Sequence, residues 1–341
     1  MRCPELQQLH PPAIGKKGWP WTEESNTLIN HGRDNATFPK ISIVTPSFNQ
    51  GNYLEETIRS VLLQGYPDIE YIIIDGGSTD NSVEIIKKYS PCLHYWVSEP
   101  DRGQSHAINK GFSKATGSIF AYINSDDFYE QNAFITAAHA FGRPEKPQLI
   151  TGDCIIFEED VIKRTFKAWW PESIAHLLKP FGSTFAQPAA FWSRDTYELV
   201  GGFDENLHYA FDREFFLKIG LLGTAPLIIG QPLARYRDHA KTKTSHTIRF
   251  YQETIPMINK YAHRCRLNAK EKQDLLLLCQ DEIAYLTVFI RWKQEGRKAG
   301  MMEFMRTLLC RPRLIRQRKF LGQLRRLLFF RKQNVAEIRN V

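Results

Sequence analysis

Short apolar segments alternate with helical patterns along residues 41–123, and this alternation constrains the fold more than any other feature of the sequence. The apolar segments are rich in β-branched and aromatic residues, as strands are. The predicted strands are residues 41–45, 71–75, 93–97 and 119–123, and the predicted helices are residues 53–64, 83–89 and 105–115. Apolar strands that alternate with helices form a parallel sheet buried on both faces. We therefore predict an α/β fold with a Rossmann-like, mostly parallel central sheet and helices on both faces.

Polar residues follow three of the predicted strands, at residues 46–49, 75–80 and 124–127. Ligands of parallel sheets bind beyond the carboxyl ends of the strands, which meet at one edge. We therefore expect these polar segments to gather at one rim and to form the binding site. Beyond residue 128 the alternation is less regular, and we expect a mixed second half. From about residue 246 the pattern is helical.

Asp126 and Asp127 are adjacent acids on this predicted rim. Transfer of a sugar from a nucleoside diphosphate needs a divalent cation that neutralises the leaving diphosphate, and Mg²⁺ or Mn²⁺ prefers carboxylate oxygens. One carboxylate can meet a ribose hydroxyl while the other coordinates the metal. The alternative is an ordinary acidic turn, because Asp is favoured at such positions.

The segment from residue 41 to residue 129 resembles the family 2 glycosyltransferases in several motifs that occur in the correct order. The matching segments are IVTPSFNQGNYLEETIRSVLLQGYP, YIIIDGGSTDNSVEIIKKY, SEPDRGQSHAINKGFSKATG and IFAYINSDDFY. The resemblance continues through QP (187–188) and VGGFDENLHYAFD (200–212) to YRDH (236–239), so that it covers about residues 40–244. It implies a GT-A fold, a nucleotide-sugar donor, an inverting transfer and dependence on Mg²⁺ or Mn²⁺.

The resemblance also implies roles for residues near the nucleotide. It assigns Thr45, Pro46 and Ser47 to the lining of the nucleotide pocket and brings Asp75 close to the base. Many relatives have two acids where this chain has Asp75 followed by Gly76, so one side-chain contact to the base is missing here. The identity of the nucleotide is therefore open.

By the same resemblance, Asp126 contacts the donor, Asp127 binds the metal and Asp212 is the catalytic base. An inverting transfer needs one carboxylate that takes a proton from the acceptor hydroxyl while this hydroxyl attacks the anomeric carbon from the face opposite the leaving group. The alternative for Asp212 is an acid at the start of a helix.

Two further segments carry candidate binding residues. Residues 237–244 resemble the closing basic motif of the family, in which His239 completes the metal or diphosphate site and Lys243 contacts phosphate. A solvated basic loop is an equally weighted alternative. The resemblance brings Arg102 and Asn109 into a motif near the donor. Gly103, between them, can instead be present only because the turn there requires glycine.

We expect three parts along the chain: an irregular N-terminal arm (residues 1–39), a GT-A catalytic domain (40–245) and a helical C-terminal region (246–341). The arm is rich in Pro, Gly and polar residues, and Trp19 and Trp21 are the candidates that attach it to the body. Fourteen basic and two acidic residues lie between residues 291 and 332, and their net charge of +12 exceeds the +8 of the whole chain.

Apolar patches interleaved with Arg and Lys in this tail are typical of interfacial amphipathic helices. Each basic residue near an anionic membrane contributes about 1 kcal/mol. We therefore predict peripheral binding to the inner face of the membrane, where a lipid-linked acceptor is presented. The alternative is a helical cap on the catalytic domain with a solvated basic face. Nucleic acid is not an expected partner, because the patches are aliphatic and lack a recognised binding module.

Several classes of protein lose support from the sequence. The six cysteines are scattered, which favours reduced thiols over disulfides or zinc. The N-terminus lacks the apolar region of a signal peptide, and no uncharged run reaches the roughly 20 residues that span a bilayer. We therefore expect a cytoplasmic protein. The motifs of dinucleotide-binding, P-loop, zinc-protease and hydrolase enzymes are also absent from the sequence.

The predicted function is inverting transfer of a sugar from a nucleoside-diphosphate sugar to a hydroxyl of a saccharide or lipid-linked saccharide, in polysaccharide, lipopolysaccharide or glycolipid synthesis. A sugar-phosphate nucleotidyltransferase is the alternative enzyme class, but it needs a Gly-rich basic loop after the first strand, and residues 45–51 contain no basic residue. The non-enzymatic alternative is a scaffold that binds nucleotide sugars without catalysing transfer.

Overall fold

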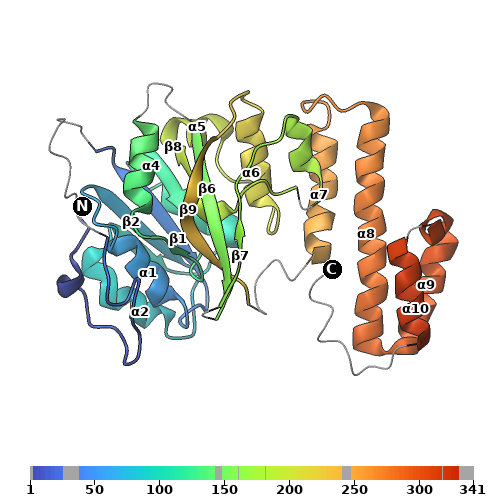
Figure 1. Cartoon of the computed structure of the whole chain (residues 1–341), viewed down its shortest axis with the longest axis horizontal. Coiled ribbons are helices and arrows are strands. Elements are labelled where there is room, and N and C mark those ends of the chain that lie inside the picture. Colours follow the sequence, from blue (N-terminus) through green and yellow to red (C-terminus); the bar gives the residue numbers. More distant parts are fainter. Residues whose placement is uncertain are drawn as a thin grey trace. The chain divides into compact units, whose positions relative to one another are not determined.

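The structure is a computed structural model that describes residues 3–25, 38–142, 148–159, 161–180, 182–239, 247–316 and 318–329. The chain forms two compact units: residues 1–177 with 182–242, and residues 178–181 with 243–341. The first unit contains the sheet, and the second contains the C-terminal helices (Figure 1). Lys243, the predicted phosphate contact, lies outside the described residues.

Strands and helices alternate in the first unit. The strands are β1 Ile41–Ser47, β2 Ile69–Asp75, β3 Tyr95–Ser98, β4 Ile119–Tyr122, β5 Phe128–Tyr129, β6 Leu149–Glu158, β7 Val161–Phe166, β8 Ala190–Ser193 and β9 Leu227–Arg237. The α-helices of this unit are α1 Leu54–Leu62, α2 Ser82–Tyr89, α3 Gln104–Phe112, α4 Ala133–Phe141, α5 Arg194–Val200 and α6 Phe211–Gly220. The second unit contains α7 Thr247–Tyr261, α8 Ala269–Glu295, α9 Arg297–Cys310, the short 3₁₀ helix η6 Pro312–Arg316 and α10 Arg318–Phe329.

One sheet runs through the first unit in the order β3-β2-β1-β4-β8-β6-β9-β5, with β7 paired to β6. Strands β1 to β4 are parallel to one another, and they are the four strands that the sequence predicts. β8 is antiparallel to both β4 and β6, whereas β6 and β9 are parallel. The predicted α/β fold and the mixed second half are therefore both confirmed.

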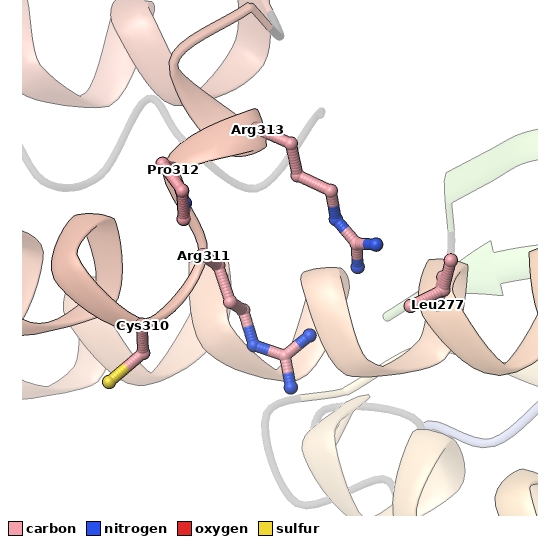
Figure 2. A pocket seen from close by; sticks show the side chains of 5 residues that line it. All are labelled: Leu277, Cys310, Arg311, Pro312 and Arg313. Carbon is pink, nitrogen blue, oxygen red and sulfur yellow. The ribbon is translucent and has the colours of Figure 1, made fainter.

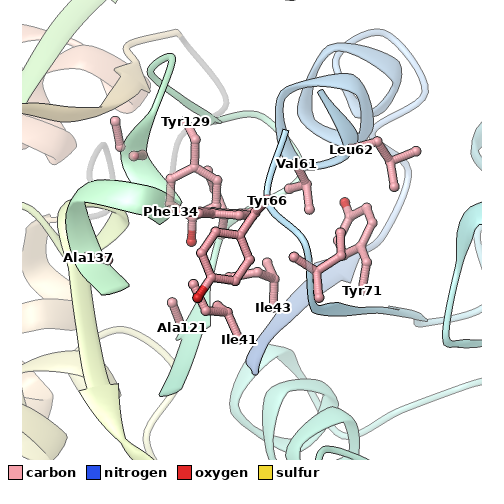
Figure 3. Close-up of a cluster of buried hydrophobic side chains, with 14 of the residues drawn as sticks. Ile41, Ile43, Val61, Leu62, Tyr66, Tyr71, Ala121, Tyr129, Phe134 and Ala137 are labelled. Atoms are coloured by element: carbon pink, nitrogen blue, oxygen red, sulfur yellow. The ribbon is translucent and has the colours of Figure 1, made fainter. Parts of the chain in front are cut away.

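The core lies between the parallel strands and helices on both faces of the sheet. Alternate residues of β1, such as Ile41 and Ile43, are fully buried and face one cluster that includes Val61 and Leu62 of α1 (Figure 3). Helix α3 packs on β1 so closely that a Cβ atom at Gly111 would lie 2.5 Å from the side chain of Val44. The period of two along β1 thus buries both faces, as a parallel sheet requires.

The N-terminal arm packs on the first unit through its tryptophans, as predicted. The indole Nε1 of Trp19 donates a hydrogen bond to the carbonyl oxygen of Tyr129 (2.7 Å). The guanidinium group of Arg59, fully buried in α1, donates to the carbonyl oxygens of Trp21 (2.8 Å) and Pro20 (3.0 Å). Charged donors to backbone carbonyls are among the stronger hydrogen bonds, so they anchor residues 20 and 21 of the arm to this unit.

Glu70 at the start of β2 is a buried carboxylate that joins neighbouring segments. It accepts hydrogen bonds from the hydroxyl of Ser42 (2.7 Å) and from the backbone N–H of Thr116 (2.7 Å). Burial raises its pKa, but these hydrogen bonds and the hydroxyl of Thr116 lower it more, so that the pKa of Glu70 falls to about 2. The ionised form is therefore the one that stabilises the fold.

We expect Glu70→Gln to lower the free energy of unfolding by about 2–3 kcal/mol at pH 7. The pKa in the folded state lies below the usual value of about 4.3 for unfolded Glu, so the stabilisation is complete above about pH 5 and is lost as the pH falls through the folded pKa. Denaturant unfolding at several pH values should show the difference from the wild type narrowing below pH 5. The exposed Glu84→Gln serves as the control, and a pH-independent loss would contradict the explanation.

The second unit is helical, as predicted from residue 246 onward. Helix α8 begins with a capping box, because Asn268 accepts from the backbone N–H of Glu271 (2.9 Å) and Glu271 accepts from that of Asn268 (2.8 Å). One hydrophobic cluster of this unit consists of Val288, Trp292, Phe304, Leu314 and Phe320. Across the described residues, every helix is too short or too polar to cross a membrane.

A cavity of about 400 Å³ lies between α8 and the junction of α9 with η6. Arg311 and Arg313 line it, and their side chains extend to the same side of the chain (Figure 2). Both guanidinium groups pair with the buried carboxylate of Asp281 on α8, at 3.3 and 2.8 Å. Part of the positive charge of the tail is therefore neutralised inside this unit.

Candidate functional site

The carboxyl ends of the parallel strands meet at one rim, as predicted. In register, Ser47 of β1 lies beside Asp75 of β2, and Asp75 lies beside Ser98 of β3. Val44 of β1 pairs with Tyr122 of β4, so the residues after Tyr122 continue to the same edge. The rim therefore brings together the polar segments that follow β1, β2 and β4.

Asp75 is fully buried, and its hydrogen bonds organise the turn after β2. The carboxylate accepts from the backbone N–H groups of Gly77 (3.1 Å) and Ser78 (2.9 Å), and from the hydroxyls of Ser78 (2.5 Å) and Ser98 (2.6 Å). With four donors and no exposed surface, the carboxylate has little capacity left for a ligand. Its contact with the base stays a prediction that this geometry does not favour.

A second carboxylate, which the sequence analysis missed, lies beside Gly76. A Cβ atom at Gly76 would lie 2.8 Å from Oδ2 of Asp101 and 3.3 Å from the ring of Phe48. Oδ1 of Asp101 accepts from the backbone N–H of Gly103 (2.8 Å), and the ring of Phe48 is exposed. An acid and an aromatic ring therefore flank the position where relatives have a second acid. Asp101 directly precedes Arg102 in the predicted donor motif, and this position is the feature of the sequence that could have indicated Asp101.

The three residues predicted to line the nucleotide pocket differ in access. Thr45 and Pro46 are buried in β1, and the hydroxyl of Thr45 lies 3.1 Å from that of Tyr71 in the core. Ser47 is also buried, but its Oγ has no hydrogen-bond partner within the described part of the chain. A buried hydroxyl without a partner costs free energy. A polar ligand group at the rim can satisfy Ser47, whereas the Thr45 side chain is already engaged.

Asp127 is the inner member of the acidic pair, and protein encloses its carboxylate. The residue is only 1% exposed, and it accepts hydrogen bonds from the backbone N–H of Arg237 (2.9 Å) and from the side-chain amide of Asn124 (3.2 Å). Burial, and next the charge of Asp126, raise the pKa of Asp127 well above its usual value. An enclosed carboxylate with both oxygens engaged is poorly accessible to a metal ion.

Asp126 is the outer member and meets His239, which lies 113 residues further along the chain. Oδ2 of Asp126 is 3.0 Å from Nε2 of His239, and the two side chains are 16% and 14% exposed. At a metal–ligand distance of about 2.1 Å, neighbouring ligands of an octahedral cation lie about 3 Å apart. The carboxylate oxygen and the imidazole nitrogen are therefore at a spacing that suits a direct hydrogen bond and also suits joint coordination of Mg²⁺ or Mn²⁺.

Asp126 and His239 supply only two ligands, which are too few for a metal site made of protein groups alone. Among the residues that the structure describes, no group of three or more His, Cys, Asp or Glu side chains is arranged to hold a metal ion. Metals that act on phosphates commonly take one or two protein ligands and complete their coordination with phosphate oxygens and water. The donor set at Asp126 and His239 agrees with that type of site.

Arg237, the last residue of β9, fixes the acidic turn in place. Its Nε donates to the carbonyl oxygen of Asp126 (3.0 Å), and its guanidinium group pairs with Glu56 of α1 (2.5 Å). The guanidinium also lies over the ring of Tyr53, 4.8 Å from its centroid, and the ring of Tyr53 contacts that of His239. β9 therefore delivers His239 to the acidic turn through contacts that are distant in sequence.

Asp212, the predicted base, lies in the first turn of α6. The preceding residue, Phe211, packs against Tyr122 at the end of β4, with ring centroids 6.3 Å apart. Burial raises the pKa of Tyr122 well above its usual value, and the charges of Asp212 and Asp127 raise it further. The charges of Asp212 and Asp127 are therefore both close enough to affect Tyr122 at the end of β4.

The motif residues Arg102, which precedes α3, and Asn109, which lies in it, form structural contacts. Arg102 is exposed and pairs with Glu205 (2.6 Å). The amide of Asn109 donates to the carbonyl oxygen of Phe203 (2.8 Å) and to Glu205 (3.1 Å), and it accepts from the hydroxyl of Tyr197 (2.9 Å) and the N–H of Phe203 (3.0 Å). These bonds use the full capacity of the amide. Asn109 thus ties α3 to the segment after α5, and its predicted donor contact stays a prediction.

Sequence comparisons identify the family. The model of glycosyl transferase family 2 matches residues 42–193. An uncharacterized glycosyltransferase of Mycobacterium tuberculosis (strain CDC 1551 / Oshkosh) is 31% identical over 189 residues, which cover 54% of this chain and 70% of that relative. This chain is a family 2 glycosyltransferase. Asp212 and His239 lie beyond the segment that the family model matches.

Solved structures with the same fold support the GT-A prediction. Residues 1–349 of S. aureus TarS in complex with UDP-GlcNAc match this glycosyltransferase with a TM-score of 0.50 and 16% identity, over 85% of this chain and 80% of that one. A longer TarS chain is covered over 43% of its length. The mannosyltransferase PcManGT from Pyrobaculum calidifontis, in complex with GDP-Man and Mn²⁺, matches with a TM-score of 0.50 and 17% identity, over 86% and 88% of the two chains. The GT-A fold of this family 2 glycosyltransferase is thereby confirmed.

Proposed function

We propose that this family 2 glycosyltransferase moves a sugar, with inversion, from a nucleoside-diphosphate sugar to an acceptor hydroxyl in a metal-dependent reaction. The observation that carries the proposal is the pair of Asp126 and His239, whose carboxylate oxygen and ring nitrogen lie 3.0 Å apart at the rim. The nucleotide sugars in the TarS and PcManGT complexes, and the Mn²⁺ in the latter, support the donor class and the cofactor.

Asp126 and His239 hold Mg²⁺ or Mn²⁺ in this proposal. When bound, the metal neutralises the negative charge of the departing diphosphate. Asp127 stands behind the pair and fixes the turn through its hydrogen bonds to Arg237 and Asn124. The resemblance implies that Asp127 binds the metal and Asp126 contacts the donor, whereas the greater accessibility of Asp126 favours Asp126 as the metal ligand.

Asp212 is the catalytic base in this proposal. The acceptor oxygen attacks the anomeric carbon, the bond from that carbon to the diphosphate oxygen breaks, and the carboxylate of Asp212 takes the proton of the acceptor hydroxyl. The nucleoside diphosphate leaves with the electron pair of the broken bond. Because attack and departure take place on opposite faces of the sugar, the configuration inverts.

The nucleoside end of the donor is recognised at Gly76. Asp101 accepts hydrogen bonds from N–H groups of the base, the exposed ring of Phe48 stacks on the base, and the hydroxyl of Ser47 makes a polar contact that it lacks within the described residues. A carboxylate accepts from uracil and from guanine, since both carry ring N–H donors. The proposal therefore includes both uridine and guanosine donors.

The remaining parts of the chain support this reaction. Residues 40–245 form the catalytic domain, residues 1–39 are an accessory arm, and residues 246–341 attach the enzyme peripherally to the cytoplasmic face of a membrane. The acceptor is a saccharide or lipid-linked saccharide of a cell-envelope polysaccharide or glycolipid. The basic composition of the C-terminal region supports this location.

A donor panel tests the proposal. Uridine, guanosine, adenosine and thymidine diphosphate sugars are incubated with the full chain, and release of the nucleoside diphosphate is measured with Mn²⁺, with Mg²⁺ and with a chelator. We expect release from one nucleotide class that the chelator abolishes and Mn²⁺ restores. Donor binding without turnover on any acceptor would instead favour a non-catalytic scaffold.

The same panel tests the nucleoside contact. Asp101→Asn is expected to raise KM for the preferred donor about 10- to 150-fold, because a hydrogen bond to a charged acceptor contributes about 1.5–3 kcal/mol. Asp195→Asn, an exposed acid on α5, is the control. An unchanged KM in Asp101→Asn would remove Asp101 from the site without affecting the proposed reaction.

A further inference from the structure

Helix α9 exposes apolar side chains on one face. Met302, Met305 and Leu309 are 72%, 52% and 82% exposed. Residues three, four and seven positions apart lie on the same side of a helix, so the three side chains form one stripe. We call Met302, Met305 and Leu309, with Lys298 and Arg306, the α9 outer face.

The opposite side of α9 is the one that packs in the second unit. Gly300, Phe304 and Thr307 are buried there, and the ring of Phe304 stacks on that of Phe320 with centroids 4.5 Å apart. A helix at the surface of a soluble unit normally has one apolar side, and a helix that is apolar on both sides is normally buried on both. The outer face of α9 therefore has the composition of a second contact surface.

The charges on the outer face specify the partner. Lys298 and Arg306 lie one turn before and one turn after Met302, on the same side of the helix, and both are exposed. Neither forms an ion pair with a residue in the described part of the chain, in contrast to Arg311 and Arg313, which bind Asp281. The outer face thus combines an apolar stripe with cations that remain available.

We propose that the α9 outer face docks on an anionic lipid bilayer. An interfacial helix lies in the membrane plane, with its apolar stripe among the acyl chains and its basic residues at the headgroups. A second copy of the chain fits this surface less well, because a symmetric contact would bring Lys298 and Arg306 of both copies together. The proposal rests on the membrane attachment in the proposed function and names the surface that makes it.

Vesicle sedimentation of the full chain tests the proposal. We expect the wild type to sediment with vesicles of phosphatidylcholine and phosphatidylglycerol but not with phosphatidylcholine alone, and added salt should release it. Combined Met302→Ser, Met305→Ser and Leu309→Ser should lower the partition coefficient by about tenfold or more, as should combined Lys298→Gln and Arg306→Gln. Leu199→Ser, an equally exposed apolar residue on α5, is the control.

Two further measurements separate the outcomes. An environment-sensitive fluorophore on the exposed Cys310, in a Cys92→Ser background, should shift to the blue on anionic vesicles with the outer face intact. Nucleoside diphosphate release with a water-soluble acceptor should be unchanged in the α9 variants. The proposal on membrane docking and the proposal on catalysis can therefore be tested separately. Equal partitioning of wild type and both variants, no shift at Cys310, or loss of self-association in place of vesicle binding would overturn the proposal.

Discussion

Replacement of Asp212 by Asn is expected to lower kcat for sugar transfer by about 10²- to 10⁴-fold while donor affinity changes little. The asparagine keeps the size of the side chain at the start of α6 but cannot accept the proton of the acceptor hydroxyl. Because the proton moves only as the acceptor attacks, the loss should fall on kcat and not on binding of the donor. Nucleoside diphosphate release with acceptor, together with calorimetric binding of the donor, measures the two quantities separately.

Asp195→Asn is a matched control for this variant. Asp195 also lies in the first turn of a helix, α5, and it is exposed. It should retain wild-type kcat. Full transfer activity in Asp212→Asn would show that another group removes the proton and would leave Asp212 as an acid at the start of a helix.

Asp126→Ala and Asp127→Asn are expected to differ in their effects on turnover. Asp126→Ala should reduce metal-stimulated turnover about 10³-fold, because a metal at a departing diphosphate contributes several kcal/mol of charge stabilisation. His239→Gln should act in the same direction. Asp127→Asn should instead keep the response to Mn²⁺ and change the free energy of unfolding by no more than about 1 kcal/mol, because the raised pKa of Asp127 shows that the fold favours the neutral form, which the amide mimics.

Turnover as a function of Mn²⁺ concentration and denaturant unfolding of each variant measure these two effects. Asp126→Ala should remain as stable as the wild type within about 1 kcal/mol, because its side chain is partly exposed, so that water can replace its contact with His239. If Asp127→Asn lost its response to Mn²⁺ and Asp126→Ala kept it, the metal ligand would be Asp127, as the sequence resemblance implies.

The elements that could be predicted from the sequence are those with a strong local pattern. Residues 41–45 and 71–75 are short segments rich in β-branched and apolar residues, which favour a strand covered on both faces, and β1 and β2 contain them. The pairings of β8 and β9 could not be predicted from the sequence. β8 pairs with β4 and β6, and β9 pairs with β6, through contacts that are distant in sequence. Local pattern carries no information about such pairings.

Candidate site residues divide in the same way. The strand pattern and the motif order were sufficient to predict that Asp126 and Asp127 follow the end of β4 at the rim, whereas the role of Asp212 at the start of α6 stays a prediction. Motif order could not show that Asn109 and Asp75 differ from residues that face the rim. The polar groups of Asn109 and Asp75 already form hydrogen bonds within the protein. Polar residues of either kind look the same in a sequence, because hydrogen-bond partners are known only from the fold.

The sequence by itself determined the family, the GT-A fold and the strand end that carries the acidic pair, because periodicity and motif order are local properties of the chain. The tertiary structure alone decided which member of the pair is accessible, that His239 meets Asp126 across 113 residues, and that Asp101 lies against Gly76. The physical reason is burial. Whether a carboxylate can bind a ligand depends on the solvent and the donors that surround it, and packing of distant segments supplies both.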